Sequence, residues 1–223
     1  VPVNDPATQI SAMAAVTEHL GFGVTAAATF EQPYTLARRY ASLDHLTEGR
    51  VGFNVVTSYL PSAAENQGLP TQIPHDERYD IADEFLDVCY KLWEGSWEDG
   101  AVVKDRERGI YADPSKVHPI GHKGKYFSVP GISLTEPSPQ RTPVIFQAGA
   151  SSRGQKFSGK HAEAVFISAL RPDLTRVVTD RIRAAAEEQG RSRDDVKILA
   201  MLSVIVDETE EKAKAKYEEY KKY

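Results

Sequence analysis

The sequence predicts an α/β fold in which a parallel sheet is covered by helices. Two observations predict it: the strand-like segments are apolar almost throughout, and they alternate with amphipathic helical segments. Strands of a parallel sheet are buried on both faces and therefore appear as continuous apolar runs. Doubly wound and barrel forms both fit this pattern. In either form, ligand-binding residues collect where strands end and helices begin.

The composition disfavours several classes of protein. The 223 residues are 41% hydrophobic and 26% charged, as in an ordinary globular domain. A net charge of −5 argues against a nucleic-acid partner, and no apolar run approaches the ~20 residues of a membrane helix. The single cysteine, Cys89, excludes an internal disulfide and fits a reducing compartment, so we expect a cytoplasmic protein.

The two ends of the chain lack the usual signals. The first residue is not methionine, and the last residues stop within a helical pattern without a capping glycine or proline. We therefore expect an internal fragment of a longer protein, in which residues 1–223 form one partial domain.

Two helix–strand repeats are expected at the start of the chain. Residues 6–20 have a rough 3.6-residue apolar period, and residues 21–30 form a strand whose glycines also stop that helix. Pro33 suits the first turn of the next helix, which Gly49 ends, and residues 51–56 form an apolar strand. The apolar face expected for the second helix comprises Leu36, Tyr40, Leu43 and Leu46.

The clearest helix covers residues 77–93, with Asp76 as its expected N-cap. Cys89 lies on its apolar side and is expected in the core. Residues 96–140 interrupt the alternation of strands and helices, because they are rich in Gly, Pro and charge and contain one strand-like piece, KYFSV. We interpret them as a long insertion. The buried stripe expected for the helix comprises Ile81, Phe85, Val88 and Leu92.

Alternation resumes after the insertion. Strands are expected at residues 144–147, 164–167 and 198–206. Helices are expected to follow them at residues 154–161, 172–189 and 208–223, the last capped by Asp207.

The turn after the strand at 144–147 is the most informative stretch. It carries Ser151, Ser152 and Gly154 and leads into a helix, so backbone N–H groups and two hydroxyls converge where a phosphate can bind. Gly and Ser also cap helices for structural reasons, so the turn alone leaves both interpretations open. It is neither a dinucleotide fingerprint nor a P-loop, because G-x-G-x-x-G is absent and no G-K-[ST] follows.

Polar side chains occur in the two earlier strands and at the start of the third helix. Thr25 lies in the first strand, and Asn54 and Thr57 lie at the end of the second. A buried amide costs ~1–3 kcal/mol unless it is paired, so Asn54 bonds either a neighbouring loop or a polar edge of a ligand. His75 and Tyr79, four residues apart, form either an exposed capping pair or a donor pair for an anion or a ring.

Several segments, in order, resemble the bacterial-luciferase-like flavin monooxygenases, and more narrowly the branch of nitrilotriacetate, dibenzothiophene-sulfone and long-chain-alkane monooxygenases. The segments are NVVTS, HDERYDIADEF, GSWED, ADPSKVHPIGHKGKYF, SPQRTPVIFQAGASSRG and KHAEAVF. The resemblance implies a (β/α)8 TIM barrel, of which the five strands here would be roughly strands 3 to 7. Residues 96–140 would be the insertion that this branch carries after the helix of the fourth strand.

The resemblance also implies a two-component monooxygenase that uses O2 and reduced FMN (FMNH2) to oxidise a small organic substrate through a flavin C4a-hydroperoxide. A separate NAD(P)H-dependent flavin reductase would supply the FMNH2, and the enzyme would be a homo-oligomer. Ser151 would take the phosphate, and Tyr79 and His75 the phosphate or ribityl end. Thr25 and Asn54 would meet the isoalloxazine side. The cofactor-binding positions implied are thus Thr25, Asn54, His75, Tyr79, Ser151 and, as a weaker match, Ser152.

Neither the pattern nor the resemblance identifies a catalytic residue. His118 and His122 have a spacing that can bind zinc, but no Cys, Asp or Glu cluster completes a site, so we expect no metal centre. Arg153 either adds a phosphate contact or faces water.

Three other functions stay open. One is an F420-dependent oxidoreductase on the same barrel, which the insertion disfavours. Another is a barrel lyase or isomerase acting on a sugar phosphate, which would need a core-facing lysine or a carboxylate base at a strand end. The third is a non-catalytic flavin-binding relative.

Overall fold

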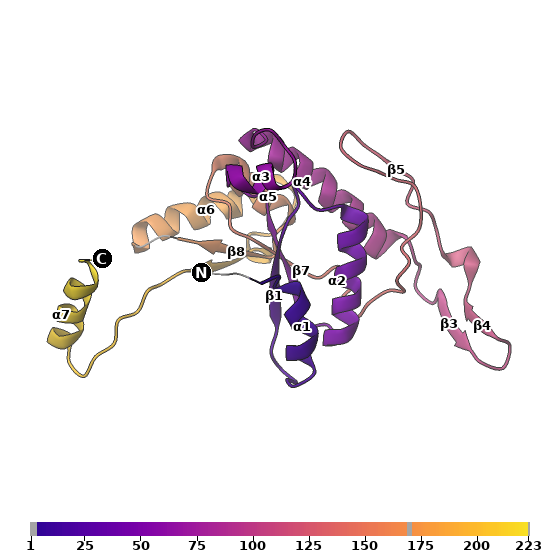
Figure 1. Ribbon diagram of the computed structural model, residues 1–223, viewed down its shortest axis with the longest axis horizontal. Helices are drawn as coiled ribbons and strands as arrows, with labels where there is room; N and C mark the ends of the chain where they lie inside the picture. The colour runs from indigo at the N-terminus through magenta and orange to yellow at the C-terminus, as the bar shows by residue number, and fades with distance from the viewer. Residues whose placement is uncertain (1–3, 169–170, 223) are drawn as a thin grey trace.

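The computed structural model, which describes residues 4–168 and 171–222, is built around a five-stranded parallel sheet (Figure 1). Because the spatial order of the strands equals their order in the chain, β1 and β9 are the two edges. A doubly wound sheet reverses its strand order partway across, and this sheet does not. The arrangement is therefore the open part of a barrel. The strands are β1 (Phe22–Ala27), β2 (Val51–Val56), β7 (Val144–Gln147), β8 (Ala164–Ile167) and β9 (Lys197–Ala200).

Helices cover one face of this sheet, and α4 continues into a π-helical turn, η1 (Lys91–Gly95). The helix α7 stands apart from the body, and none of its described residues is buried (Figure 1). Short 3₁₀ turns, η2 (Pro114–Lys116) and η3 (Arg193–Asp195), complete the helical elements. The α-helices are α1 (Ala7–Ala14), α2 (Pro33–Thr47), α3 (Pro61–Asn66), α4 (His75–Tyr90), α5 (Ser152–His161), α6 (Pro172–Glu188) and α7 (Glu210–Tyr220).

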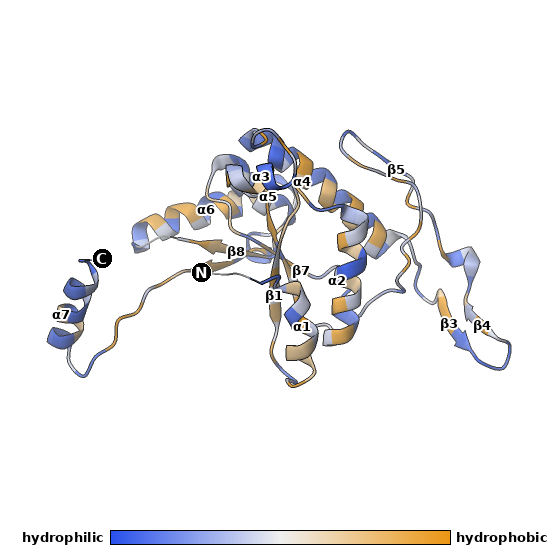
Figure 2. Ribbon diagram, viewed as in Figure 1, coloured by the Kyte–Doolittle hydropathy of each residue, from blue (hydrophilic) through white to orange (hydrophobic). Residues whose placement is uncertain are grey.

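The main core lies between the sheet and helices α2 and α4, and the hydropathy colouring of Figure 2 shows the strands as predominantly apolar. Tyr40 packs on Phe53 with 4.7 Å between ring centroids, and its hydroxyl donates to the carbonyl of Val24 at 2.8 Å. Cys89 is fully buried, which confirms its expected place. The four residues of the expected α4 stripe are also buried: Ile81, Phe85, Val88 and Leu92.

The other face of the sheet carries the polar strand residues. In the parallel register Thr25 pairs with Asn54, and Asn54 pairs with Phe146, so the three side chains share one face. Their chain neighbours point to the helix-covered face and are buried: Val24, Phe53 and Ile145. In a barrel this second face is the interior.

A glycine makes room for an aromatic pair on this interior face. A Cβ on Gly52 would lie 2.5 Å from the ring of Phe146, so the ring occupies the space that a side chain would take. Phe146 also stacks on Phe166, with 5.7 Å between centroids and 17° between planes. The two rings therefore cover the interior face beside Gly52.

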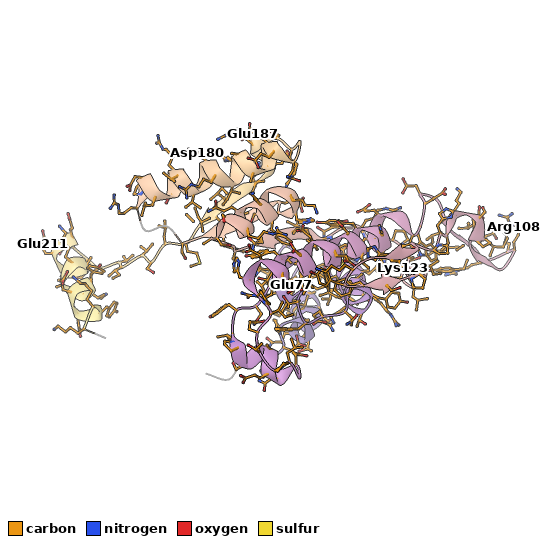
Figure 3. All side chains as sticks on the ribbon, turned by 90° about the horizontal axis from the view of Figure 1, so that it is seen from above. Glu77, Arg108, Lys123, Asp180, Glu187 and Glu211 are labelled. Carbon is orange, nitrogen blue, oxygen red and sulfur yellow. The ribbon has the colours of Figure 1, made fainter. Side chains whose placement is uncertain are left out.

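Residues 96–140 leave the sheet and form two hairpins. One pairs β3 (Val102–Asp105) with β4 (Ile110–Ala112), and the other pairs β5 (His122–Lys123) with β6 (Ser128–Val129). Figure 3 labels Arg108 at the far end of the first hairpin and Glu211 on α7 at the opposite end of the molecule. On α4, Glu84 holds the second hairpin by accepting from the backbone N–H groups of Tyr126 at 3.0 Å and Phe127 at 2.8 Å.

The first helix ends earlier than its apolar period predicts. The helix α1 stops at Ala14, and Val16 and Leu20 are exposed. The guanidinium of Arg50 donates to the carbonyls of Leu20 at 2.9 Å and Ala14 at 3.4 Å, which fixes the intervening residues as a turn. On α2, Leu46 is also exposed, although it was expected on the apolar face.

The last strand is also shorter than predicted. It ends at Ala200 rather than at residue 206, because its partner β8 ends at Ile167. The final bond of the ladder runs from the N–H of Met201 to the carbonyl of Ile167 at 2.9 Å. The apolar side chains beyond are exposed: Met201, Leu202, Val204 and Val206.

Two predicted helix caps are wrong. The helix α4 begins at His75 after Pro74, so Asp76 lies in its first turn and pairs with His75 instead of capping. The helix α7 is capped by Thr209, whose hydroxyl accepts from the N–H of Lys212. Asp207 lies two residues too early to cap and pairs with Lys216 at 2.9 Å. The end predicted at Tyr223 lies outside the described residues.

Across residues 4–168 and 171–222, no helix combines the length and the apolar character needed to cross a membrane.

Candidate functional site

A cleft of about 490 Å³ opens where β2 and β7 end and where α4 and α5 begin. Parallel sheets bind ligands at this end, and the volume lies in the ~300–1,000 Å³ range of small-molecule sites. The lining includes His75, Tyr79 and Ser151. The structure thus brings three of the predicted positions into one cavity.

Ser151 is the N-cap of α5. Its backbone is extended, with φ −68° and ψ 161°, and its Oγ accepts from the N–H of Gly154 at 3.0 Å. A hydroxyl that accepts a bond still has its own hydrogen to donate. The first-turn N–H groups of a helix have no acceptor within the helix and carry the positive end of its dipole. The start of α5 therefore presents donors suited to an anion.

Tyr79 places its hydroxyl against the same turn. The Tyr79 ring is buried between His75 and Phe157, with centroid separations of 5.3 and 5.5 Å. A Cβ on Gly149 or Gly154 would lie 2.8 or 2.7 Å from the Tyr79 hydroxyl oxygen, so the close approach requires glycine at both positions. In the part of the chain that the structure describes, this hydroxyl makes no hydrogen bond. It is available to a group bound in the cleft.

His75 is the first residue of α4 and meets Tyr79 edge-on, at 60° between the ring planes. Its Nδ1 lies 2.6 Å from the Asp76 carboxylate, and its side chain is half exposed. This contact fixes the orientation of the imidazole at the mouth of the cleft.

Thr25, Asn54 and Ser152 lie outside the lining of the cleft. Thr25 and Asn54 come two residues before Ala27 and Val56, which do line it from the same face of the sheet. The amide of Asn54 donates to the Thr25 hydroxyl at 2.8 Å, while its buried Oδ1 has no partner among the described residues. Such an oxygen costs ~1–3 kcal/mol, so it needs a donor from a ligand or a further strand. Ser152 is exposed at the first position of α5.

Gln147 is a cleft residue that the sequence analysis missed. It is only 3% exposed at the end of β7, and its Oε1 accepts from the Gly149 N–H and the Ser158 hydroxyl, each at 2.5 Å. It fixes the turn that leads to Ser151. The available signal was the same one that singled out Asn54, a side-chain amide inside an apolar strand.

The remaining polar candidates pair with other side chains. Arg153 binds Asp80 at 2.9 Å and Asp83 at 2.5 Å and lies over the Tyr79 ring, 5.5 Å from its centroid, so it does not simply face water. His118 pairs with Glu98 at 2.6 Å, whereas His122 lies 3.1 Å from Glu84, and the structure does not bring the two histidines together. Among the described residues no group of three or more His, Cys, Asp or Glu side chains could hold a metal ion.

A charged network joins α4 to α5 behind the cleft. His161 is buried, with Nε2 2.7 Å from Asp83 and Nδ1 3.1 Å from the Tyr90 hydroxyl. Burial lowers the pKa of His161, so the neutral ring donates from Nε2 and accepts at Nδ1. Burial alone would raise the pKa of Asp83, but hydrogen bonds from His161, Arg153 and Lys160 outweigh it and hold that pKa well below its usual range.

Together, the fold and the cleft define a barrel protein with a turn of hydrogen-bond donors at the carboxyl end of its strands. The chain belongs to the luciferase-like monooxygenase family, which matches residues 2–223. Its fold is accordingly the luciferase-like TIM barrel, of which it forms a part.

Two curated relatives match the whole chain. The dimethyl-sulfide monooxygenase of Hyphomicrobium sulfonivorans is 62% identical over 223 residues, which make up 46% of that protein. A crystal structure of DmoA from the same organism, also 62% identical, gives a TM-score of 0.92 over 99% of this chain and 47% of that one. The long-chain alkane monooxygenase of Geobacillus thermodenitrificans is 56% identical, with 51% of its length covered. A crystal structure of a long-chain alkane monooxygenase gives a TM-score of 0.94. The chain spans about half the length of these relatives.

A structure with a bound flavin is also similar. A riboflavin lyase that holds a modified FMN and riboflavin is 45% identical, with a TM-score of 0.93 over 98% of this chain and 49% of that one.

Proposed function

We propose that this chain forms the FMN-binding part of a two-component monooxygenase, which uses FMNH2 and O2 to oxidise a small organic substrate. The observation that carries the proposal is the turn after β7. There, Ser151 caps α5 and the Tyr79 hydroxyl lies against Gly149 and Gly154, which leaves the hydroxyl hydrogen of Ser151 and the Tyr79 hydroxyl to bind a phosphate. Family membership and relatives that are named monooxygenases support the same function.

The residues present fit FMN. A phosphate needs N–H and O–H donors without a competing carboxylate, which the start of α5 and the hydroxyls of Ser151 and Tyr79 offer. A flavin ring needs polar contacts at its edge, and Asn54 has a buried Oδ1 without a partner among the described residues.

Each residue has a distinct part in holding the cofactor. Ser151 and Tyr79 bind the phosphate, and His75 binds the phosphate or the ribityl chain. Thr25 and Asn54 face the isoalloxazine side, and Ser152 contributes at most through its backbone N–H. Reduced FMN, when bound, supplies the electrons with which O2 is activated. The chain's own residues hold and orient the cofactor and limit the access of water.

The proposal includes partners and a location. A separate NAD(P)H-dependent flavin reductase supplies FMNH2, which the relative named nitrilotriacetate monooxygenase component A supports. The enzyme is proposed to be a cytoplasmic homo-oligomer. Residues 96–140 are proposed to be an insertion in the single partial barrel domain.

The test is an anaerobic titration with FMNH2 and with reduced F420, using this chain within a polypeptide of its relatives' full length. We expect FMNH2 to bind and, once O2 and a substrate are admitted, one oxygen atom of O2 to enter the substrate while the other is reduced to water. Binding of F420 alone, or of neither cofactor, would overturn the proposal. Binding of FMNH2 without O2-dependent turnover of any sulfide, sulfone or alkane tested would leave a non-catalytic flavin protein.

A Ser151→Ala variant tests whether the Ser151 hydroxyl binds the phosphate. Loss of one hydrogen bond to a charged phosphate should weaken FMN binding by ~1.5–3 kcal/mol. Ser11→Ala, on the exposed side of α1, is the control and should leave the dissociation constant unchanged. An unchanged constant for Ser151→Ala would remove Ser151 from the site.

A further inference from the structure

Arg78 is a buried cation at the cleft with no acidic partner among the described residues. It lies in the first turn of α4 and is only 7% exposed. Its Nη1 lies 3.5 Å from the carbonyl oxygen of Thr57, at the outer limit for a hydrogen bond, and its Nε is buried with no partner in the described part of the chain. A guanidinium is a cation with donors in a planar fork, which suits a bound oxyanion.

Three other arginines close to the sheet have short contacts. Arg153 binds two aspartates, at 2.9 and 2.5 Å. Arg50 and Arg191 each donate to two or more backbone carbonyls, at distances from 2.8 Å. A buried charge costs several kcal/mol unless it is paired and hydrogen-bonded. Among the described residues Arg78 has neither an acidic partner nor a short bond to a carbonyl, only the 3.5 Å contact with Thr57.

Arg78 belongs to the same cleft as the donors of the turn. It lines the cleft together with His75, Tyr79 and Ser151. Its contact with the Thr57 carbonyl ties it to the residue directly after β2, which also accepts from the Thr29 hydroxyl at 2.8 Å. The guanidinium is thus anchored at the end of β2, in the cleft that the capped start of α5 also lines.

We propose that Arg78 binds the phosphate of the flavin and makes the site select FMN over riboflavin. This inference rests on the proposed function. A guanidinium offers paired N–H donors that match two phosphate oxygens, and the phosphate carries a charge of about −1.5 to −2 at pH 7. Binding supplies the missing anion, and the buried charge of Arg78 and that of the phosphate offset each other.

The experiment compares FMN with riboflavin, which lacks the phosphate. Dissociation constants of both are measured for the wild type, Arg78→Met, Arg78→Lys and Arg141→Met, in a polypeptide of the relatives' full length. In Arg78→Met we expect FMN binding to weaken at least about tenfold and riboflavin binding to change less than about threefold. Arg78→Lys, which keeps the charge but loses the paired donors, should lie between. Arg141→Met is the matched control and should keep the wild-type ratio of the FMN and riboflavin dissociation constants, because Arg141 is paired with Asp99 at 2.6 Å and does not line the cleft.

Riboflavin binding also reports whether each variant is folded. If riboflavin binds normally to Arg78→Met, and the ratio of the FMN to the riboflavin dissociation constant equals that of the wild type, the inference is wrong. An equal loss of FMN binding in Arg141→Met and Arg78→Met would assign the effect to general charge rather than to Arg78. If the wild type binds neither flavin, the proposed function itself fails, which is a different result.

Thermal unfolding without ligand separates binding from a structural role. If the buried charge of Arg78 is unpaired without ligand, it destabilises the ligand-free protein. Arg78→Met should then unfold at the same or a higher temperature than the wild type. Inorganic phosphate should then raise the unfolding temperature of the wild type but not of the variant. A lower unfolding temperature for Arg78→Met together with lost binding of both flavins would show that the residue only supports the strand end.

Discussion

At the residue scale, the turn after β7 depends on two glycines, which leave room for Tyr79, as much as on the side chains that bond to the turn. Gly149 and Gly154 let the Tyr79 hydroxyl approach the backbone, and the Oε1 of Gln147 holds the Gly149 N–H. Ser151 then starts α5 in the direction that this turn sets. The hydroxyl of Tyr79, the hydroxyl of Ser151 and the helix start are thereby brought to one place.

We predict that Gly154→Ala weakens FMN binding. The new Cβ would lie 2.7 Å from the Tyr79 oxygen and 3.0 Å from the Gly149 Cα, so Tyr79 must move. Such overpacking costs ~1–3 kcal/mol, which should appear in both the unfolding free energy and the dissociation constant. Gly95→Ala is the control, because a Cβ there meets nothing within 4 Å. Equal unfolding free energies and FMN dissociation constants for the two variants, measured by calorimetry, would show that Tyr79 can move without destabilising the protein or the site.

Ser151→Asp separates helix capping from phosphate binding. Aspartate caps a helix as well as serine does, so the unfolding free energy should stay within ~0.5 kcal/mol of the wild type. Its charge repels a phosphate, so FMN should bind at least tenfold more weakly than riboflavin does. Retained FMN binding, followed by fluorescence quenching, would mean that the phosphate lies elsewhere.

At the element scale, the pairing of α4 with α5 sets the geometry of the cleft, since Tyr79 belongs to one helix and Ser151 caps the other. Asp83 on α4 receives three side-chain donors from α5: Arg153, Lys160 and His161. His161 in turn accepts from Tyr90 of α4. The network fixes the rotation of each helix relative to the other.

This network predicts a pH dependence of stability. The pKa of His161 is lower in the folded protein than its ordinary value of ~6.5, so its contribution is complete above that pH and is lost as the pH falls below it. Asp83, whose pKa is also lowered, loses its contribution below about pH 4. The unfolding free energy should therefore fall between pH 7 and pH 5, with a slope of at most ~1.4 kcal/mol per pH unit for this one group.

Urea unfolding across that pH range measures the effect. His161→Gln keeps a donor for Asp83 without the titrating ring, so its profile should be flatter above pH 5. His19→Gln, at an exposed position before β1, serves as the control and should follow the wild type. Parallel profiles for the wild type and His161→Gln would assign the pH dependence to other groups.

The sequence predicts the elements better than it predicts their ends. The apolar stripe of α4 is visible because burial repeats with the helical period, and the alternation of apolar strands and helices predicts the parallel sheet. The end of β9 depends on the length of β8, and the end of α1 depends on Arg50, far away in the chain. Such distant partners leave no local signal.

The candidate site is predictable to a similar degree. Strand ends and a small-residue turn indicate where Ser151, Tyr79 and His75 lie. The sequence does not indicate Arg78 or Gln147 as site residues. A charged or amide side chain is usually exposed, and only the fold shows that these two are buried.

At the scale of the whole molecule, the sheet is open at β1 and β9, and apolar residues extend beyond its last strand. A closed barrel has no such edges. The helix α7 lies beyond this segment and is separate from the rest (Figure 1).

We predict that the chain of residues 1–223, prepared alone, self-associates. Unpaired strand edges and exposed apolar side chains favour contacts between copies. Sedimentation should give a species larger than the 24.7 kDa monomer. Lysine at two exposed apolar positions, Leu202 and Val204, should reduce the association without changing the circular dichroism. A monodisperse monomer would show that the open sheet is tolerated.

The path of the chain between β2 and β7 has a further consequence. These strands are adjacent in the sheet, yet the whole excursion of residues 96–140 lies between them in the sequence. It leaves after η1 and returns before Val144, on the side of the sheet away from the cleft, so its length is independent of the spacing between Tyr79 and Ser151. The segment can therefore gain or lose residues without changing the positions of Tyr79 and Ser151.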